Sequence, residues 1–155
     1  MNATIASVRT APSPLARSPL TTMLPVRDPS RARAWYEGVL GLAPEGLRPD
    51  GKFVFRCGNG ALLALFPKPE GIKAEHTAVS FEVADIAAAI RALSARGVVF
   101  HDYDLPGFRT VDHVGVQGSE KAAWFSDPDG NILCIHEDIA QGPDPRAPPA
   151  GTHGD

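Results

Sequence analysis

The sequence predicts an α+β fold made of two β-α-β-β-β modules related by internal duplication. Three observations support this prediction: two capped amphipathic helices each follow a short β-like run, each helix precedes several short strands, and matching features recur at a constant offset. Val26 and Asp28 of the first half recur as Val83 and Asp85, 57 positions later. Self-similarity of this kind indicates one supersecondary unit used twice.

The first helix is predicted in DPSRARAWYEGVLG, residues 28–41. Asp28 suits the N-cap, Pro29 the first turn, and Gly41 the end of the helix. Apolar residues recur every three or four positions and predict one buried face, formed by Ala32, Trp35, Tyr36, Val39 and Leu40. For Trp35 and Tyr36 this pattern favours packing in the core over contact with a ligand.

The second helix is predicted in DIAAAIRALSARG, residues 85–97. Asp85 is the expected N-cap and Gly97 the expected stop. Its apolar face comprises Ile86, Ala89, Ile90 and Leu93. The second half therefore repeats the helix of the first half with the same capping chemistry.

Short strands complete each half. The first half offers TTMLPV before its helix and PEGLR, KFVFRC and ALLALF after it; the second offers HTAVSFEV, then VFHDYDL, KAAWFS and NILCIH. CGNG and DPDG are turn sequences between the last two strands of each half. Aligning ALLALF with NILCIH gives an offset of 70, which is 13 more than 57. The loop 104–118 has no counterpart and accounts for the difference; we expect it to act as a lid over a binding site.

Composition excludes several classes of function. The chain has 155 residues, 43% of them hydrophobic and 21% charged, with a net charge of −3 and no cluster of Lys or Arg. A nucleic-acid partner needs a basic surface, so none is expected. No apolar run approaches the roughly 20 residues of a membrane span. Cys57 and Cys134 lie outside any C-x-x-C pair, which favours a reducing, cytoplasmic location over a disulfide-bonded secreted fold.

The two ends of the chain differ in composition from its middle. Residues 1–19 mix Ala, Ser, Pro and Arg without periodicity, so we expect a disordered extension, with a transit peptide as the alternative. Residues 140–155 are rich in Pro and Gly and are expected to form a disordered tail. The predicted domain therefore covers 20–139, with modules at about 20–70 and about 74–138.

Three segments resemble a known family. MLPVRDPSRARAWYEGVLGL resembles the opening of the vicinal oxygen chelate superfamily, which includes glyoxalases, bleomycin resistance proteins and extradiol dioxygenases. FEVADIAAAIRAL and FSDPDGNILCI resemble the matching segments of the second module, and the resemblance covers about residues 21–138. It implies that the two curved mixed sheets pair into a cup for a small-molecule ligand, in a homodimer. Whether the modules pair within one chain or across a dimer is left open.

The same resemblance identifies where a metal would be held. Metal-using members take ligands from the first and last strands of each module, and these places fall on Thr21, Ala64, Ala78 and Cys134. These residue types do not form a site for a divalent cation, so we expect no metal and no other cofactor. A displaced site using His76 and His136 is disfavoured because these residues lie about 13 Å apart along neighbouring parallel strands, far beyond the ~2 Å bonds of a ligand.

Strand alternation predicts which side chains line the cup. The candidate substrate-binding residues are Met23, Leu62, Phe66, His76, Ser80, Trp124, Cys134 and His136. Each has an ordinary structural alternative. The histidines are also common at a solvated rim, Cys134 is also expected as a small buried apolar residue, and Trp124 is also expected to pack on the sheet. The expected cavity is mostly apolar with few polar groups, as in small-molecule pockets.

Two functions remain open from the sequence. The favoured one is a metal-free binding protein of the bleomycin-resistance type that holds an aromatic or apolar ligand. The alternative is a lyase, isomerase or dioxygenase, either metal-dependent with displaced ligands or metal-free with His76 or His136 as the general base.

Overall fold

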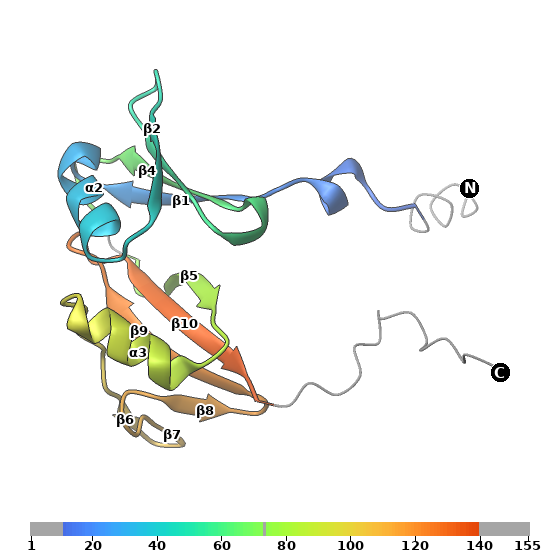
Figure 1. Cartoon of the computed structure of the whole chain (residues 1–155), viewed down its shortest axis with the longest axis vertical. Coiled ribbons are helices and arrows are strands. Elements are labelled where there is room, and N and C mark those ends of the chain that lie inside the picture. Colours follow the sequence, from blue (N-terminus) through green and yellow to red (C-terminus); the bar gives the residue numbers. More distant parts are fainter. Residues whose placement is uncertain (1–10, 73, 140–155) are drawn as a thin grey trace. The chain divides into compact units, whose positions relative to one another are not determined.

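The computed structural model describes residues 11–72 and 74–139 (Figure 1). These residues form two compact units, which divide between Ala74 and Glu75, except that 128–131 belong to the first unit. The predicted tail and the first ten residues of the predicted extension lie outside the described residues. The remainder of the extension contains a short 3-10 turn, η1 (Pro14–Arg17), whose side chains are exposed.

The first unit consists of one helix and a four-stranded sheet. The strand order is β1-β4-β3-β2, with β1 parallel to β4 and the other pairs antiparallel. In chain order the elements are β1 (Thr21–Val26), α2 (Pro29–Gly38), β2 (Ala43–Leu47), β3 (Phe53–Arg56), η2 (Gly58–Gly60) and β4 (Leu62–Pro67).

The predicted caps of the first helix are confirmed. The Asp28 carboxylate accepts hydrogen bonds from the backbone amides of Ser30 at 3.0 Å and Arg31 at 3.4 Å. The helix ends at Gly38, a little before the predicted stop, and Gly41 then takes a φ of 71°, as a glycine after a helix end commonly does. Sequence and local geometry therefore agree at both ends of α2.

One face of the first sheet packs against α2. Tyr36 of the helix is fully buried, and its ring centroid lies 6.0 Å from that of Phe55 in β3. Phe53 and Phe55 share that face, with ring centroids 5.0 Å apart, and the Arg33 guanidinium lies 4.4 Å from the centre of the Phe53 ring. The remaining core side chains of this face are Leu24, Val26, Ala32, Leu63 and Leu65.

The second unit repeats this topology. Its sheet has the order β5-β10-β9-β8, again with the first and last long strands parallel, which confirms the predicted duplication of the module. The elements are β5 (Thr77–Glu82), α3 (Ile86–Ala95), β6 (Asp104–Leu105), β7 (Phe108–Arg109), β8 (Gly115–Gln117), β9 (Glu120–Ser126) and β10 (Ile132–Asp138), of which β6 and β7 form a separate two-stranded hairpin.

The second helix also has the predicted cap. Asp85 accepts a hydrogen bond from the Ala88 amide at 3.0 Å, and Gly97 takes a φ of 102° just after the helix. Ile86 and Ile90 are its buried residues. They belong to a core that also contains Val98, Phe100, Ala123, Phe125, Leu133 and Ile135.

One predicted strand of the second unit is wrong. The segment 99–105 pairs with β9 only at an isolated bridge between Phe100 and Phe125, and the edge strand of the sheet is β8, which lies inside the predicted loop 104–118. The backbone of Tyr103 pairs instead with Thr110, whose amide donates to the Tyr103 carbonyl oxygen at 2.9 Å. Asp102 is also a poor strand former. The extra segment of the second module thus supplies part of the sheet.

The turn between β7 and β8 has an uncommon backbone. Val111 and Val114 exchange two backbone hydrogen bonds, of 2.9 and 3.0 Å, around Asp112 and His113. These two central residues have φ angles of 51° and 71°, as a type I′ turn requires, although neither is a glycine. The His113 Nδ1 lies 2.9 Å from a carboxylate oxygen of Asp102, a contact that stabilises the turn.

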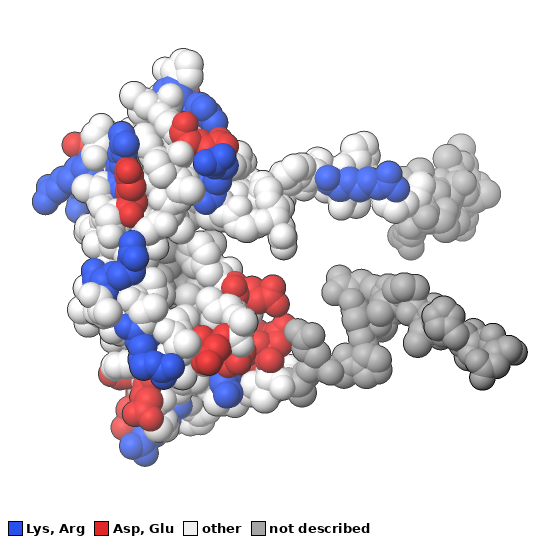
Figure 2. All heavy atoms as spheres, viewed as in Figure 1, with Lys and Arg blue, Asp and Glu red and all other residues white. Residues whose placement is uncertain are grey.

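Charged side chains are distributed differently on the two units. On the face shown in Figure 2, basic and acidic side chains are interspersed on the first unit, whereas acidic ones gather on part of the second. The strand register places four acids at one end of the second sheet: Glu82, Glu120, Glu137 and Asp138. Among the described residues, no helix has the length and apolar character needed to span a membrane.

Candidate functional site

The sheet face of the second unit that α3 does not cover holds most of the predicted site residues of this unit. Cys134 of β10 pairs with Trp124 of β9 on one side and with Ser80 of β5 on the other. Paired residues project to the same side of a sheet, so these three side chains form a row. We call this side the helix-free face; it carries Thr77, Ser80, Ala122, Trp124, Cys134 and His136.

Ser80 and His136 form a close polar pair on the helix-free face. The Ser80 Oγ lies 2.6 Å from the His136 Nδ1. If the imidazole proton is on Nε2, the hydroxyl donates to Nδ1; in the other tautomer, Nδ1 donates to the hydroxyl. The pair can therefore either accept or donate a proton towards a ligand, and it links β5 to β10 through side chains.

Cys134 lies beside this pair and is buried. Removal of the thiol from water raises its pKa, and a hydrogen bond with Ser80 opposes that shift without reversing it. The thiol therefore keeps its proton at neutral pH, where a nucleophile would need the thiolate. In this structure Cys134 acts as a small apolar wall of the site.

Three aromatic rings gather over Trp124. The ring centroids of Tyr103 and Phe108 each lie 5.6 Å from that of Trp124, both in edge-to-face geometry. The Trp124 Nε1 donates a hydrogen bond to the Thr77 Oγ1 at 3.2 Å, which fixes the orientation of the indole. Phe108 packs so closely over Gly115 that no Cβ would fit there. The extra segment of the second module therefore supplies an aromatic wall to the helix-free face.

A small cavity opens beside this wall. Its volume is about 170 Å³, and it is lined by Gly115, Gln117, Glu120, Ala122 and Trp124. Gly115 and Ala122 are paired in the register, and their small size leaves the space. The cavity combines one aromatic surface with two polar side chains at its edge.

A β-bulge changes which residues of β5 reach the helix-free face. Thr77 pairs with Ile132 and Val79 pairs with Leu133, so Ala78 is left without a partner in β10. Simple alternation from Ser80 predicts Ala78 and His76 on this face, whereas Thr77 is the residue that contacts Trp124. His76 is exposed and precedes the strand, about five residues along β10 from the level of His136, or about 16 Å. The two candidate histidines are therefore not brought together.

The sequence placed Phe108 only within the expected lid 104–118, and it gave no indication of Tyr103 or Thr77. Tyr103 lies in the segment 99–105, which was predicted as a strand. No local signal identifies Thr77, because the bulge results from pairing with β10.

The other candidate residues lie on the first unit. Met23 pairs with Ala64 in the β1–β4 register, and Leu62 and Phe66 lie two residues to either side of Ala64. All four lie on the face that α2 does not cover. Met23 is 47% exposed, whereas Ala64 is buried. This face carries no hydrogen-bonded polar pair comparable with Ser80 and His136 among the described residues.

The four places that hold metal ligands in related proteins do not fit a metal here. Ala64 and Ala78 have no side-chain donor atom, Thr21 offers only a hydroxyl, and Cys134 offers a single buried thiol. Within the described part of the chain, no three or more His, Cys, Asp or Glu residues are grouped so that they could hold a metal ion.

Known proteins share this architecture. A putative glyoxalase family protein from Bacillus anthracis has 22% identity and a TM-score of 0.58, covering 76% of this chain and 90% of that one. Lactoylglutathione lyase from Agrobacterium tumefaciens has 21% identity and a TM-score of 0.55, covering 78% and 93%. A glyoxalase/bleomycin resistance protein/dioxygenase from Alicyclobacillus acidocaldarius has 17% identity and a TM-score of 0.59, covering 80% and 93%. At these identities the likeness concerns the fold.

A comparison with curated protein sequences gave no match. The sequence profile of the Glyoxalase/Bleomycin resistance protein/Dioxygenase superfamily matches residues 19–135, which is most of the chain. The duplicated β-α-β-β-β topology described above agrees with that match. The protein therefore belongs to the glyoxalase/bleomycin resistance protein/dioxygenase superfamily.

Proposed function

We propose that the protein binds a small aromatic or apolar molecule without a metal, at the helix-free face of its second unit. The observation that carries this proposal is the edge-to-face cluster of Tyr103, Phe108 and Trp124 next to the Ser80–His136 pair. An aromatic wall with few orienting polar groups is the usual composition of a small-molecule site. As the sequence suggests, the protein would act in the cytoplasm as a homodimer.

The charges near the site favour a neutral ligand over an anionic one. In the register Glu82 pairs with His136, and Glu120 lines the small cavity. Carboxylates beside the site repel an anion, whereas they do not repel a neutral ring. A neutral aromatic molecule with one hydroxyl could place its ring against Trp124 and its hydroxyl at the Ser80–His136 pair.

The metal-free part of the proposal rests on the side chains at the four ligand places, two of which are alanines. Its test is elemental analysis of the purified protein. Less than about 0.1 equivalent of Zn, Ni, Fe and Mn per chain is expected. A stoichiometric amount of any of these metals, bound tightly enough to survive dialysis against a chelator, would overturn this part.

The binding proposal can be tested with a co-purified ligand and with a simple probe. Native mass spectrometry of the purified protein looks for a small-molecule adduct, and saturation-transfer NMR measures binding of 4-methylphenol. Trp124→Ala is expected to abolish both signals, because it removes the central ring of the aromatic wall. Val99→Ala is the matched control, since Val99 is 80% exposed and outside the site, and should leave both unchanged. Signals that survive Trp124→Ala, or that are absent in the unmodified protein, contradict the proposal.

A metal-free enzyme is the second candidate, and the 2.6 Å contact between Ser80 and His136 favours it. An imidazole within hydrogen-bond reach of a hydroxyl can act as a general base on that hydroxyl or on a bound substrate. The lyase, isomerase and metal-free dioxygenase activities of such a base all depend on the same imidazole.

A test of this candidate compares the hydrolysis of 4-nitrophenyl acetate by the unmodified protein, His136→Ala and Ser80→Ala. A general base would make the unmodified protein at least tenfold faster than His136→Ala. Equal rates for all three proteins would leave binding as the function of the site.

A further inference from the structure

We propose that the first unit contains a separate site for a small aromatic carboxylate, between α2 and the turn 128–131. A cavity of about 570 Å³ lies there, lined by residues of the end of β1, the outer side of α2, and Pro128 and Asp129 of the turn. All of these residues belong to the first unit. The volume falls within the range of about 300–1,000 Å³ that is common for small-molecule sites. This inference is independent of the function proposed for the second unit.

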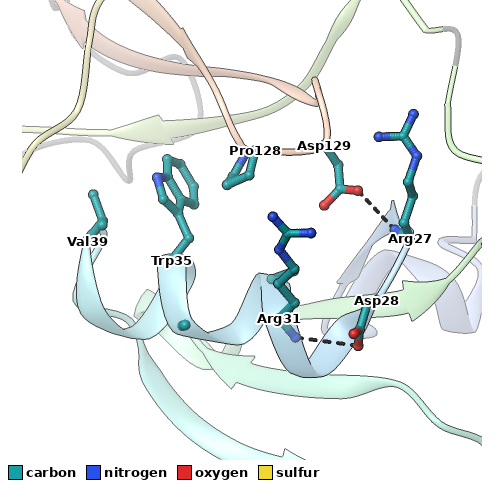
Figure 3. Close-up of a pocket in the computed structure, with 9 residues that line it drawn as sticks. Arg27, Asp28, Arg31, Trp35, Val39, Pro128 and Asp129 are labelled. Atoms are coloured by element: carbon teal, nitrogen blue, oxygen red, sulfur yellow. Dashed lines mark hydrogen bonds between the residues drawn. The ribbon is translucent and has the colours of Figure 1, made fainter.

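The cavity has an aromatic wall. Trp35 and Tyr36 are neighbours on the apolar stripe of α2, yet only Tyr36 is fully buried. Trp35 is half-buried and lines the cavity together with Val39 and Pro128. Figure 3 shows the indole projecting from α2 on the side of the turn, next to Pro128. A flat ring can therefore lie against the indole, with apolar side chains around it.

Two arginines supply positive charge at the other end of the cavity. Arg31 projects from α2 towards Asp129 (Figure 3), and Arg27 follows β1 at the rim. Among the described residues neither guanidinium forms an ion pair, whereas Arg33 pairs with Glu37 at 2.8 Å and Arg48 with Glu45 at 3.0 Å. A planar guanidinium presents two parallel N–H groups that match a carboxylate.

The two carboxylates in the lining, those of Asp28 and Asp129, accept hydrogen bonds from backbone amides. Asp28 accepts from the first amides of α2, so it already occupies the N-terminus of that helix. Asp129 accepts a hydrogen bond from the Arg27 amide at 3.0 Å. The formal charges of the lining balance, but the carboxylates are held in place while the guanidinium groups can turn towards a ligand. An organic anion that carries one aromatic ring can pair with the arginines and pack its ring against Trp35.

The position of the Arg27 side chain supports this arrangement. A Cβ built on Gly71 would lie 2.8 Å from the Arg27 Nη2, so the guanidinium packs directly against the backbone of Gly71. Gly71 has a φ of 80°, which glycine adopts at little cost. The Arg27 side chain therefore lies at the rim of the cavity, packed against Gly71.

Fluorescence quenching provides the test. The chain has two tryptophans, so Trp124→Phe leaves Trp35 as the only one and also removes the indole of the proposed site in the second unit. Titration with 4-nitrobenzoate should quench Trp35 saturably. In the same background Arg31→Gln should weaken binding about five- to tenfold, as expected for the loss of a charge-assisted hydrogen bond. Arg48→Gln, the matched charge control, should change it less than about twofold.

The neutral isostere 4-nitrobenzamide should bind at least about fivefold more weakly than 4-nitrobenzoate, and added salt should weaken binding of the anion. Unsaturable quenching, equal affinity of the two probes, or unchanged affinity in Arg31→Gln would overturn the proposal. If Trp124→Phe does not fold, the indole NH resonances of the unmodified protein provide the readout: 4-nitrobenzoate should shift that of Trp35, and no shift would overturn the proposal. Failure of 4-methylphenol to bind would contradict only the site proposed in the second unit.

Discussion

The two units share one topology and differ in what lies on their helix-free faces. Each begins with a strand, continues with a helix capped by an aspartate, and ends with a strand parallel to the first. Phe55 and Phe125 occupy equivalent positions, since each pairs with a buried leucine of the last strand, Leu63 or Leu133. The frame of the module is therefore maintained by the same few interactions in both copies.

The differences are concentrated in one segment and one face. After α3 the second unit inserts a hairpin and a tight turn before its edge strand, and the rings of Tyr103 and Phe108 from this insertion reach Trp124. The second unit also has the Ser80–His136 pair. The two units therefore share their core and their helix caps, and they differ in the insertion and in the side chains of the helix-free face.

Truncation of one buried ring in each unit tests whether the two cores contribute equally to stability. Phe55→Ala and Phe125→Ala should each lower the free energy of unfolding by about 3–5 kcal/mol, because each removes a fully buried ring. Urea denaturation followed by circular dichroism measures both. Leu47→Ala, at a 65% exposed position, should cost less than about 0.5 kcal/mol. A loss below about 1 kcal/mol for either phenylalanine would show that the two copies are not energetically equivalent.

The insertion can be tested at its closest contact. Gly115→Ala should destabilise the protein by about 1–3 kcal/mol, since the new methyl group would meet the Phe108 ring. Gly38→Ala in the first unit has open space around it and should be neutral, or stabilising by up to about 1 kcal/mol. Thermal unfolding distinguishes the two. Phe108→Ala should restore part of the stability lost in Gly115→Ala; absence of any such recovery would contradict the contact.

The two helix caps should respond alike. Asp28→Ala and Asp85→Ala should each cost about 1 kcal/mol, through the loss of hydrogen bonds to the first helical amides. The cost should be slightly larger for Asp28, which accepts from two amides. Chemical denaturation of both variants, with Asp→Asn replacements as controls that keep a capping oxygen, measures the effect. A difference above about 1 kcal/mol between the two alanine variants would mean that the caps are not equivalent.

The smallest expected effect concerns the single cysteine of each unit. Burial raises the pKa of both the Cys57 and the Cys134 thiols. Above about pH 8.5 the unfolded thiol loses its proton first, so the folded state binds more protons and stability falls as pH rises. Cys134→Ala and Cys57→Ala should therefore each lose less Tm between pH 7 and pH 10 than the unmodified protein. The same alkaline loss in variant and unmodified protein would contradict the thiol contribution.

Local signals were sufficient for much of the fold. Aspartates before apolar periodicity, glycines after it, and turn sequences such as DPDG are short-range features, and both helices begin where these signals place them. The constant offset then predicted that the second module repeats the first. Ser80, Cys134 and His136 were assigned to one face by alternation, and the register agrees for all three.

The features that were missed depend on contacts distant in sequence. In the segment 99–105 apolar and polar residues alternate, as they do in a strand. In the structure the backbone of this segment is hydrogen-bonded to Thr110, and β8 forms the edge of the sheet. Trp35 belongs to the apolar stripe of α2. It lines a cavity because the turn that contains Pro128 and Asp129 forms the opposite wall. Neither outcome is encoded within a window of neighbouring residues.

The bulge in β5 has a consequence for how the chain tolerates changes in length. Because Ala78 is an extra residue between Thr77 and Val79, its deletion would leave both of these residues with their present partners in β10. In a stretch of strand without a bulge, deleting one residue turns every following side chain to the opposite side of the sheet. Position 78 is therefore a point where a natural or engineered single-residue deletion can shorten the protein while the side chains of the helix-free face keep their order.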